Sequence, residues 1–534
     1  MTKYFKYSKC GCKFPLDKNG NIIFNPDIGQ INLNCSATWN MISAGNTKGC
    51  FQLESRLGRS MAKKLKPDSI EQLSALISIM RPGCLEAVRD GKTVSTHYID
   101  KKNGLESVDY FHPSLESILG NTYGEMVYQE QAMQIAKELA GFDLREADML
   151  RKAIGKKKAD EMSKLKNKFL QGCAKKNIIS QEQAEQIFSW IEKSQRYSFN
   201  KSHAVSYAMN AYLSAYSKAH FTRTFFASYL KFAKDKLDAQ QEIKELIQNA
   251  SQMDIHVSTP DIRKINRYFV LKDKIIYFGL TDIKGLGQSV FNKLENLVNK
   301  IDISSYTWIE MLLNILLNIN STASKAIIAS GALDHLGKPR NEMLFEYSIA
   351  SDLTKKEIEK CQKYIDKNTN LKKILQLLHQ DKINIRRKEI VQNHILSLDK
   401  PPFDLNDSIE WIADKEYELL GHSISCSKID MYDVSNANTT CAEFSKTTNQ
   451  EIVMAGEIES INIVKTKTGK NKGSDMAFIS MSDNTGVLES VIAFPESYRT
   501  YQNVLFNSNI VIIKGIRSKD RDSLIVDKVY IPKA

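Results

Sequence analysis

Lys201 and His203 belong to a basic stretch interleaved with aromatic residues, RYSFNKSHAVSYA at positions 196–208. Ser202 is typical of an N-cap residue, which predicts a helix that begins at His203. The amides that lack partners in the first turn, and the positive end of the helix dipole, would then lie beside Lys201 and His203. This combination indicates a phosphate-binding site that needs no glycine-rich loop. The alternative interpretation is an ordinary helix that begins with basic residues on its exposed face.

A second basic cluster lies in MLRKAIGKKK, residues 149–158. Arg151 and Lys152 fall in the last turn of a predicted helix that ends at Gly155. Three further basic residues follow this glycine: Lys156, Lys157 and Lys158. Cations that compensate the helix dipole would account for one or two of these five charges. Two basic clusters in one helical region favour a triphosphate or a nucleic-acid backbone as the ligand.

A Gly-x-Gly turn lies between two apolar segments in IKGLGQSV, residues 283–290. Such a turn is typical of a helix-hairpin-helix element, whose exposed amides bind DNA phosphates without reading base sequence. The alternative is a plain helical turn in which the glycines serve as C-caps.

Carboxylates suited to catalysis are difficult to find in this sequence. Phosphoryl transfer between nucleotides normally uses two carboxylates that hold two metal ions. The sequence contains no G-x-x-x-x-G-K-[ST] loop, no H-E-x-x-H motif and no D-x-D on a convincing strand. Asp90 and Asp100 are the nearest acidic candidates, and each is expected to be a surface or turn residue. The catalytic residues therefore stay unassigned.

The nine cysteines do not form a recognisable metal motif. An odd number of scattered cysteines favours reduced thiols in a cytosolic protein. Cys10 and Cys12 form a C-x-C pair, with Cys35 and Cys50 further along. Zinc sites usually combine two paired C-x(2–4)-C arms, and the second arm is missing. We therefore expect ordinary thiols and no metal site.

Apolar residues at helical spacing predict a mostly helical region from about 46 to 255. Asp143 with Glu146, and Ser180 with Gln183, have the spacing of capping boxes that begin helices. Gly141 is expected to end the helix before the first of these boxes.

Strands are expected in three places. Residues 1–45 carry an Asn-Gly turn between short apolar runs, and residues 263–280 predict a hairpin that turns at Lys272 and Asp273. From about residue 450 onward, alternating apolar residues predict five short strands and a small β-barrel.

The fold class predicted from these patterns is a multidomain α+β protein. It would combine a mostly helical domain, a helix-hairpin-helix module and a C-terminal β-barrel of the OB-fold type. The expected divisions are 1–45, 46–255, 256–350, a helical connector at 351–445, and 446–534.

Length and charge agree with a nucleic-acid-binding protein of several domains. The 534 residues carry 74 Lys+Arg against 62 Asp+Glu, a net charge of +12. This excess favours a polyanionic partner. No run of 18 apolar residues and no secretory signal is found, so we expect no membrane partner and a cytoplasmic location.

Several stretches resemble the fingers region of bacterial replicative DNA polymerases of the C family, the polymerase III alpha subunit. They include GCFQLESRLGRSMAKKLKP, YGEMVYQEQAMQIAKELAGFDLREADMLRKAIGKKK and YSFNKSHAVSYAMNAYLSAY, in the order and spacing of the family over residues 25–345. YFGLTDIKGLG resembles the family's tandem helix-hairpin-helix signature, and EYELLGHSIS resembles the segment that leads into its OB-fold barrel.

The resemblance implies roles for the matching positions. Six residues would hold or support the incoming deoxynucleoside triphosphate (dNTP): Arg151, Lys152, Lys201, His203, Gln129 and Glu130. Six would contact DNA: Arg81, Lys156, Lys157, Lys284, Gly285 and Gly287. Arg81 would lie beside the same cleft as the nucleotide-binding residues.

The sequence also departs from the family. The metal-binding PHP domain that begins an alpha subunit is not recognised, nor are the palm motifs P-D-x-D-x-D-F and K-x-D-F-L-G. The resemblance therefore implies a C-terminal part whose palm and catalytic Mg²⁺ are supplied by a separate PHP/palm polypeptide. Primer-template DNA and dNTPs would be the other partners. A sliding clamp is a further candidate partner, although QLLHQ at Gln376 is only a loose match to a clamp-binding peptide.

Three hypotheses follow. The leading one is a subunit of a split template-directed DNA polymerase that is inactive by itself. The second is a non-catalytic DNA-binding protein derived from a polymerase. The third, in which Asp90 or Asp100 replaces the palm, lacks the required second carboxylate.

Overall fold

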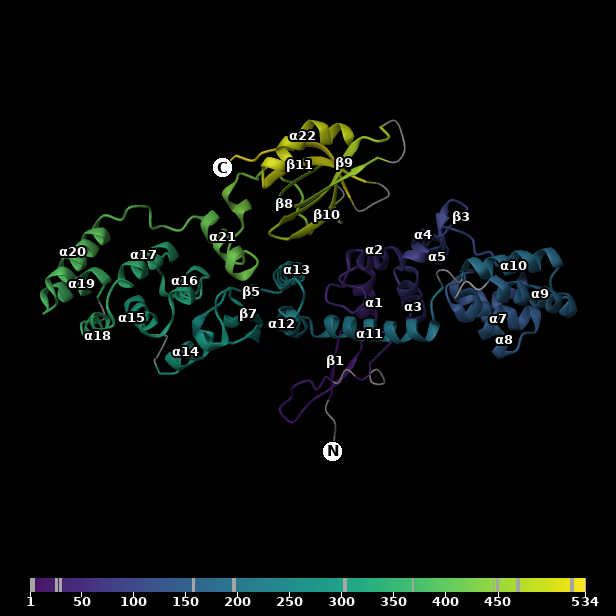
Figure 1. Cartoon of the computed structure of the whole chain (residues 1–534), viewed down its shortest axis with the longest axis horizontal. Helices are drawn as coiled ribbons and strands as arrows, with labels where there is room; N and C mark the ends of the chain where they lie inside the picture. Colours follow the sequence, from purple (N-terminus) through teal and green to yellow (C-terminus); the bar gives the residue numbers. More distant parts are fainter. Residues whose placement is uncertain are drawn as a thin grey trace. The chain divides into compact units, whose positions relative to one another are not determined.

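The computed structural model describes residues 5–24, 27, 31–155, 159–194, 198–300, 305–366, 369–444, 446–447, 451–466, 471–518 and 523–533. The chain divides into two compact units, Met1–Phe225 and Phe226–Ala534. Figure 1 shows mostly helices in the first unit, and helices followed by a β-barrel in the second. No helix among the described residues is long and apolar enough to cross a membrane.

The first unit begins with an antiparallel hairpin of β1 (Phe5–Tyr7) and β2 (Lys13–Pro15), and β3 (Val88–Arg89) pairs with β4 (Lys92–Thr93). Its helices are α1 (Ser36–Ser43), α2 (Arg56–Leu65), α3 (Ile70–Ile79), α4 (Pro82–Glu86), α5 (Val94–Lys102), α6 (Glu116–Leu119), α7 (Gln129–Ala140), α8 (Leu144–Gly155), α9 (Ala159–Lys176), α10 (Gln181–Ser194) and α11 (Lys201–His220). Helix α12 (Thr222–Ala233) crosses the boundary between the units.

Local capping explains where several of these helices begin and end. The Asp143 carboxylate accepts the Glu146 amide at 2.7 Å, and Glu146 accepts the Asp143 amide at 3.1 Å. Ser180 and Gln183 form the same reciprocal pair before α10. Gly141 ends α7 with a φ of 71°, a conformation that glycine adopts at little cost. All three signals were predicted from residue spacing.

Helix α11 packs against α3 through a face of small side chains. Four buried alanines lie on this face at helical spacing: Ala204, Ala208, Ala211 and Ala215. Leu73, Leu76 and Ile77 of α3 are buried in the same core. Small residues allow two helix axes to approach closely. The contact with α3 therefore fixes the position of α11, and with it the position of the residues at the N-terminus of α11.

The second unit begins with α13 (Ala239–Ser251) and a small sheet in the order β5-β7-β6. Strands β6 (Val270–Lys272) and β7 (Ile275–Tyr277) form the expected hairpin, and β5 (Val257–Ser258) pairs in parallel with β7. The turn occupies Asp273 and Lys274, one residue later than predicted, with φ values of 50° and 69°. Positive φ at both turn residues is the type I′ pattern that suits the twist of a two-residue hairpin.

A helical array follows this sheet and shares one hydrophobic core with it. Its helices are α14 (Gln288–Val298), α15 (Trp308–Asn318), α16 (Ser321–Ala329), α17 (Arg340–Ala350), α18 (Lys355–Gln362), α19 (Leu371–Gln380), α20 (Ile385–Asp399) and α21 (Ile409–Leu420). Gln376, the loose match to a clamp-binding peptide, lies inside α19, and Leu375 and Leu378 beside it are fully buried.

The C-terminal barrel is closed, with the strand order β10-β12-β11-β8-β9. Its elements are β8 (Ile452–Lys465), β9 (Asp475–Asp483), β10 (Gly486–Ala493), α22 (Pro495–Asn507), β11 (Ile510–Arg517) and β12 (Leu524–Tyr530). Strands β10 and β12 are parallel, and the other neighbours are antiparallel. Five strands with a helix between the third and fourth form an OB-fold, as the sequence predicted.

Candidate nucleotide and DNA interface

The N-terminus of α11 presents the basic stretch that the sequence singled out. The N-cap is Asn200, whose side-chain oxygen accepts the His203 amide at 2.9 Å. The predicted N-cap, Ser202, lies inside the helix, and its hydroxyl donates to Asn200 at 2.7 Å. The helix therefore begins two residues earlier than predicted, and both Lys201 and His203 lie in its exposed first turn.

Helix α7 contributes a carboxylate to this terminus. Glu130 accepts the Lys201 amide and the Asn200 side-chain amide, each at 2.9 Å. The neighbouring Gln129 amide donates to the Phe199 carbonyl at 2.9 Å, and Phe199 forms an isolated bridge with Tyr128. The amides of Lys201 and His203, at the helix end where a phosphate is expected, therefore already donate to the oxygens of Glu130 and Asn200. The sequence did not indicate these hydrogen bonds.

A row of rings and cations covers the same surface. The Arg81 guanidinium lies 3.9 Å from the centre of the Phe199 ring. Next in the row, the His203 ring lies 5.4 Å from Phe199 and 4.2 Å from Tyr207. The Lys201 ammonium lies 5.6 Å from the Tyr128 ring. Cations over aromatic faces, beside a helix N-terminus, can bind an anionic group and stack a planar one.

Five of the predicted nucleotide- or DNA-binding residues thus come together here, from three parts of the chain. They are Arg81, Gln129, Glu130, Lys201 and His203.

Arg151 and Lys152 bind a carboxylate of their own helix. Both donate to Asp148, at 2.8 Å and 2.6 Å, and these bonds lower the pKa of the Asp148 carboxyl, with Lys152 contributing most. Lys156, Lys157 and Lys158 lie outside the described residues. Among the described residues, the second basic cluster therefore consists of Arg151 and Lys152, both paired with Asp148.

The Gly-x-Gly turn exposes a row of backbone amides. Ile283, Leu286 and Val290 are buried beneath it, while Lys284, Gly285 and Gly287 are exposed. Gly285 has a φ of 96° and packs on α16, so only glycine suits this position. A side chain at Gly287 would meet no atom within 4 Å, which leaves the backbone open to a ligand.

The hydrogen bonds at this turn define which amides are available. The Lys284 amide donates to the Leu419 carbonyl at 2.9 Å and is therefore satisfied. Within the described part of the chain, the amides of Gly287, Gln288 and Ser289 donate to no protein acceptor. The segment before the turn is a short 3-10 helix, Leu280–Asp282. The open amides at the start of α14 are the feature that suits a phosphate.

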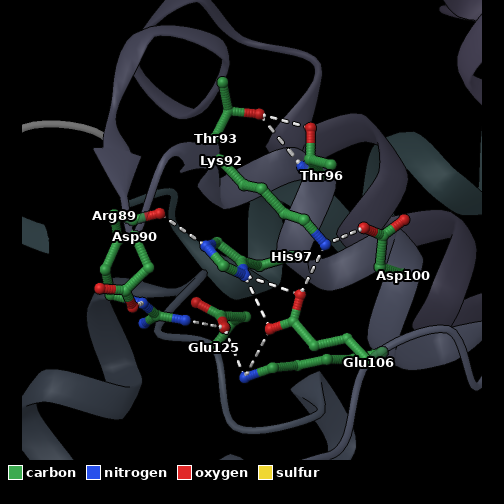
Figure 2. Close-up of polar contacts among 10 residues, drawn as sticks. Arg89, Asp90, Lys92, Thr93, Thr96, His97, Asp100, Glu106 and Glu125 are labelled. Atoms are coloured by element: carbon green, nitrogen blue, oxygen red, sulfur yellow. Dashed lines mark hydrogen bonds and ion pairs between the residues drawn. The ribbon is translucent and has the colours of Figure 1, made fainter.

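Asp90 and Asp100 do not form a metal site. Asp100 accepts the Lys92 ammonium at 2.7 Å, and Asp90, in a turn with a φ of 48°, lies 3.7 Å from Arg89 (Figure 2). Each carboxylate is paired with a cation, although Lys92 also binds Glu106 and Arg89 also binds Glu125, and the expectation of surface or turn residues is met. Two carboxylates neutralised in this way do not fit the Mg²⁺ ions of nucleotidyl transfer.

A buried ion-pair network beside them has a structural role. Glu125, 1% exposed, accepts Arg89 at 2.5 Å and Lys101 at 2.9 Å. The two ring nitrogens of His97 lie 2.7 Å from Glu106 and 2.8 Å from the Arg89 carbonyl (Figure 2). These contacts fix the β3–β4 hairpin on α5, and they use the local carboxylates for packing.

The structure also gathers residues that sequence reasoning left apart. Three of the cysteines, Cys10, Cys12 and Cys35, meet His220 at the end of α11, with their ligand atoms all within 4.8 Å of one another. Cys50, considered with them in the sequence, is buried elsewhere, and burial raises the pKa of its thiol to about 12. The C-x-C pair could be recognised in the sequence as a possible pair of metal ligands, but His220 lies 210 residues after Cys10.

Comparison with known proteins identifies two regions of the chain. Residues 16–177 match the family described as bacterial DNA polymerase III alpha subunit finger domain, and residues 254–343 match a helix-hairpin-helix motif. DNA polymerase III subunit alpha of Aquifex aeolicus is 32% identical over 514 residues, which cover 94% of this chain and 40% of that protein. The Borreliella burgdorferi protein of the same name is 31% identical and covers 95% and 42%.

The resemblance to C-family polymerases is therefore confirmed. The DNA polymerase III subunit alpha of Bacillus subtilis, 28% identical, gives the same coverage of about two fifths. The chain spans about two fifths of the length of the curated relatives that it matches.

Proposed function

We propose that this chain, a C-family polymerase homologue matching part of the polymerase III alpha subunit, forms the fingers and DNA-holding part of a template-directed DNA polymerase. The observation that carries the proposal is the convergence of Arg81, Lys201 and His203 on the first turn of α11. A dNTP brings a triphosphate that these cations can bind and a base that the neighbouring rings can stack.

DNA would be held by the second unit. The open amides of Gly287, Gln288 and Ser289 suit a backbone phosphate, a contact that carries no sequence preference. The OB-fold adds a surface for single-stranded DNA. The +12 net charge supports the same polyanionic ligand.

The catalytic carboxylates would come from a palm outside these residues, which would also hold Mg²⁺. Two observations support this arrangement. The palm motifs of the family are not recognised in the sequence, and Asp90 and Asp100 are each paired with a cation. These residues would then position dNTP and primer-template, and the palm would supply the metal that activates the primer 3′ hydroxyl.

A second candidate function is DNA binding without catalysis. Glu130 favours it, because its carboxylate occupies the amide that a phosphate would otherwise receive. In that case the hairpin module and the barrel would bind DNA with a steep salt dependence, and nucleotides would have no effect.

The first experiment measures dNTP binding to the full chain by fluorescence titration, with Lys201→Ala and the control Lys175→Ala. Lys175 is an exposed lysine of α9 in the same unit, so it matches the change in charge. We expect Lys201→Ala to weaken binding at least about 10-fold, the loss of one charge-assisted bond, while Lys175→Ala leaves it unchanged. Equal dNTP affinities of the Lys201→Ala and Lys175→Ala variants would contradict the proposed nucleotide site.

The second experiment is primer extension with Mg²⁺ and dNTPs. The chain is assayed alone and after addition of a candidate palm polypeptide. Extension only in the mixture supports a palm outside these residues, and extension by these residues alone contradicts it. DNA binding without extension or dNTP binding supports the second candidate function.

A further inference from the structure

Three cysteines and one histidine form a compact cluster in the first unit, at the end of α11 remote from Lys201. Cys10 and Cys12 lie in the turn between β1 and β2, Cys35 is the N-cap of α1, and His220 is the last residue of α11. The Cys10 sulfur lies 3.5 Å from each of the Cys12 and Cys35 sulfurs. Nε2 of His220 lies 3.3 Å from the Cys35 sulfur and 3.9 Å from the Cys10 sulfur.

These separations match the edges of a metal tetrahedron. Around Zn²⁺, with bonds of about 2.3 Å to sulfur and about 2.0 Å to nitrogen, neighbouring ligand atoms lie about 3.5–3.8 Å apart. The four separations given above run from 3.3 to 3.9 Å, and all six pairs of ligand atoms lie within 4.8 Å. A small movement of the side chains would therefore bring all four atoms to bonding distance of one ion.

We propose that Cys10, Cys12, Cys35 and His220 form a structural zinc site. Three thiolates and one imidazole complete a four-coordinate shell and leave no position for a substrate, which distinguishes a structural site from a catalytic one. Soft sulfur ligands in this geometry favour Zn²⁺ over Mg²⁺. The site is separate from the proposed polymerase chemistry and does not depend on it.

The surroundings hold the ligands in place. The Ser8 hydroxyl accepts the Cys12 amide at 2.9 Å, and the Gly11 amide donates to the Ser8 carbonyl at 3.0 Å, so the turn presents both cysteines to one side. Asn32 Nδ2 lies 3.8 Å from the Cys12 sulfur, where it can donate to a thiolate. Cys35 precedes the first turn of α1, whose dipole favours negative charge on its sulfur.

The position of His220 separates a metal site from a disulfide. Its ring packs against Phe14, with centroids 5.1 Å apart, and Tyr216, at 4.4 Å, and these contacts direct Nε2 toward two sulfurs. A disulfide between two of the cysteines would require no imidazole and would leave the third cysteine as a free thiol. Four convergent ligand atoms are what zinc binding requires.

The proposed ion would connect three distant segments of the chain. The β1–β2 turn, the start of α1 and the end of α11 are joined at one point, across sequence separations of 25 and 185 residues. A cross-link of this kind stabilises a fold because no preformed site exists in the unfolded chain. It would anchor the hairpin on α11, the helix whose opposite end carries Lys201 and His203.

The test begins with the full chain purified in the presence of ZnCl₂ and dialysed against metal-free buffer. Elemental analysis is expected to find one zinc per chain in the wild type and in the control Cys50→Ser, a buried cysteine outside the cluster. Cys35→Ser and His220→Ala are expected to lose at least about 90% of the zinc. Full retention of zinc by both variants would overturn the proposed ligands.

A second measurement remains informative if those variants fail to fold. Co²⁺ is added to the zinc-free wild type, to Cys50→Ser and to His220→Cys, which keeps four ligands. The site predicts tetrahedral cobalt absorption with a thiolate charge-transfer band in all three, and a band shift only in His220→Cys. Octahedral spectra, or no zinc in the wild type together with a disulfide found by mass spectrometry, would contradict the proposal.

Discussion

The Glu130 carboxylate accepts the backbone amide of Lys201 at 2.9 Å, so an acidic side chain of α7 occupies the first turn of α11. This terminus therefore has the cations and rings expected of a phosphate site. It also has a carboxylate, whose negative charge repels a phosphate. The two groups compete for the same amide, and a bound phosphate would have to displace Glu130.

Substitution of Glu130 tests that competition. Glu130→Gln keeps a hydrogen-bond acceptor but removes the charge, and like charges about 4 Å apart repel by about 1 kcal/mol when water screens them as in bulk solvent. We expect the affinity for a dNTP to rise about 5-fold at low ionic strength. Glu138→Gln, on the exposed face of the same helix, is the control and should have no effect. Weaker binding by Glu130→Gln would instead assign the carboxylate a direct role in nucleotide binding.

Gly287→Asp separates stability from DNA binding. Aspartate is a better N-cap than glycine, so α14 should become more stable by a few tenths of a kcal/mol. Its carboxylate would cover the open amides and repel phosphate, which should weaken DNA binding at least about 10-fold. Thermal unfolding and DNA titration at two salt concentrations measure the two effects.

The control for this variant is Asn370→Asp, which adds the same charge at the N-cap of α19. It should leave DNA affinity within about 2-fold of the wild type. If both variants weaken binding equally, net charge is the cause and the hairpin turn is not the contact.

Glu416 stabilises the connection between the helical array and the barrel. This side chain is fully buried and accepts the Arg340 guanidinium at 3.0 Å and the Ile424 and Ser425 amides at 2.6 and 2.8 Å. Glu416→Ala leaves the Arg340 charge buried with only Asp334 as a charged partner, and we expect a loss of about 3–5 kcal/mol in the free energy of unfolding.

Chemical denaturation checks this value, with Lys415→Ala as the control. Lys415 forms an exposed pair with Glu418, so its removal should cost less than about 1 kcal/mol. A small effect of Glu416→Ala would mean that the buried pair contributes little beyond packing.

Asp282 should make the second unit less stable as pH rises. Burial raises the pKa of this carboxyl to about 7, although the Lys234 ammonium opposes the shift, and one carboxylate oxygen has no partner in the described residues. Between about pH 4 and pH 7 the folded state keeps a proton that the unfolded chain has lost. The stabilisation is therefore complete below pH 4 and is lost as pH rises through 7.

Asp282→Asn supplies a neutral side chain of the same shape. We expect it to raise the free energy of unfolding by about 1–3 kcal/mol at pH 8 and to have no effect at pH 4. The exposed Asp235→Asn should change neither value by more than about 0.5 kcal/mol. Denaturation curves at the two pH values decide the question, and a pH-independent effect would contradict the assigned titration.

The sequence by itself determined the features that depend on neighbours within a few residues. The capping pairs Asp143–Glu146 and Ser180–Gln183 and the glycine that ends α7 could be predicted because their hydrogen bonds close within one helical turn. The barrel could be predicted because alternation along each strand records which face is buried. The resemblance to C-family polymerases rested on the same kind of linear evidence, the order and spacing of motifs.

Tertiary structure alone decided which hydrogen bonds and ligand contacts join distant segments. Glu130 reaches an amide 71 residues away, and His220 reaches a sulfur 185 residues away. Neither pairing leaves a trace in residue spacing, because each depends on how α11 packs against α3 and on where its two ends then lie. A short chain segment can encode its own hydrogen bonds, but contacts between distant segments are set by the packing of the whole core.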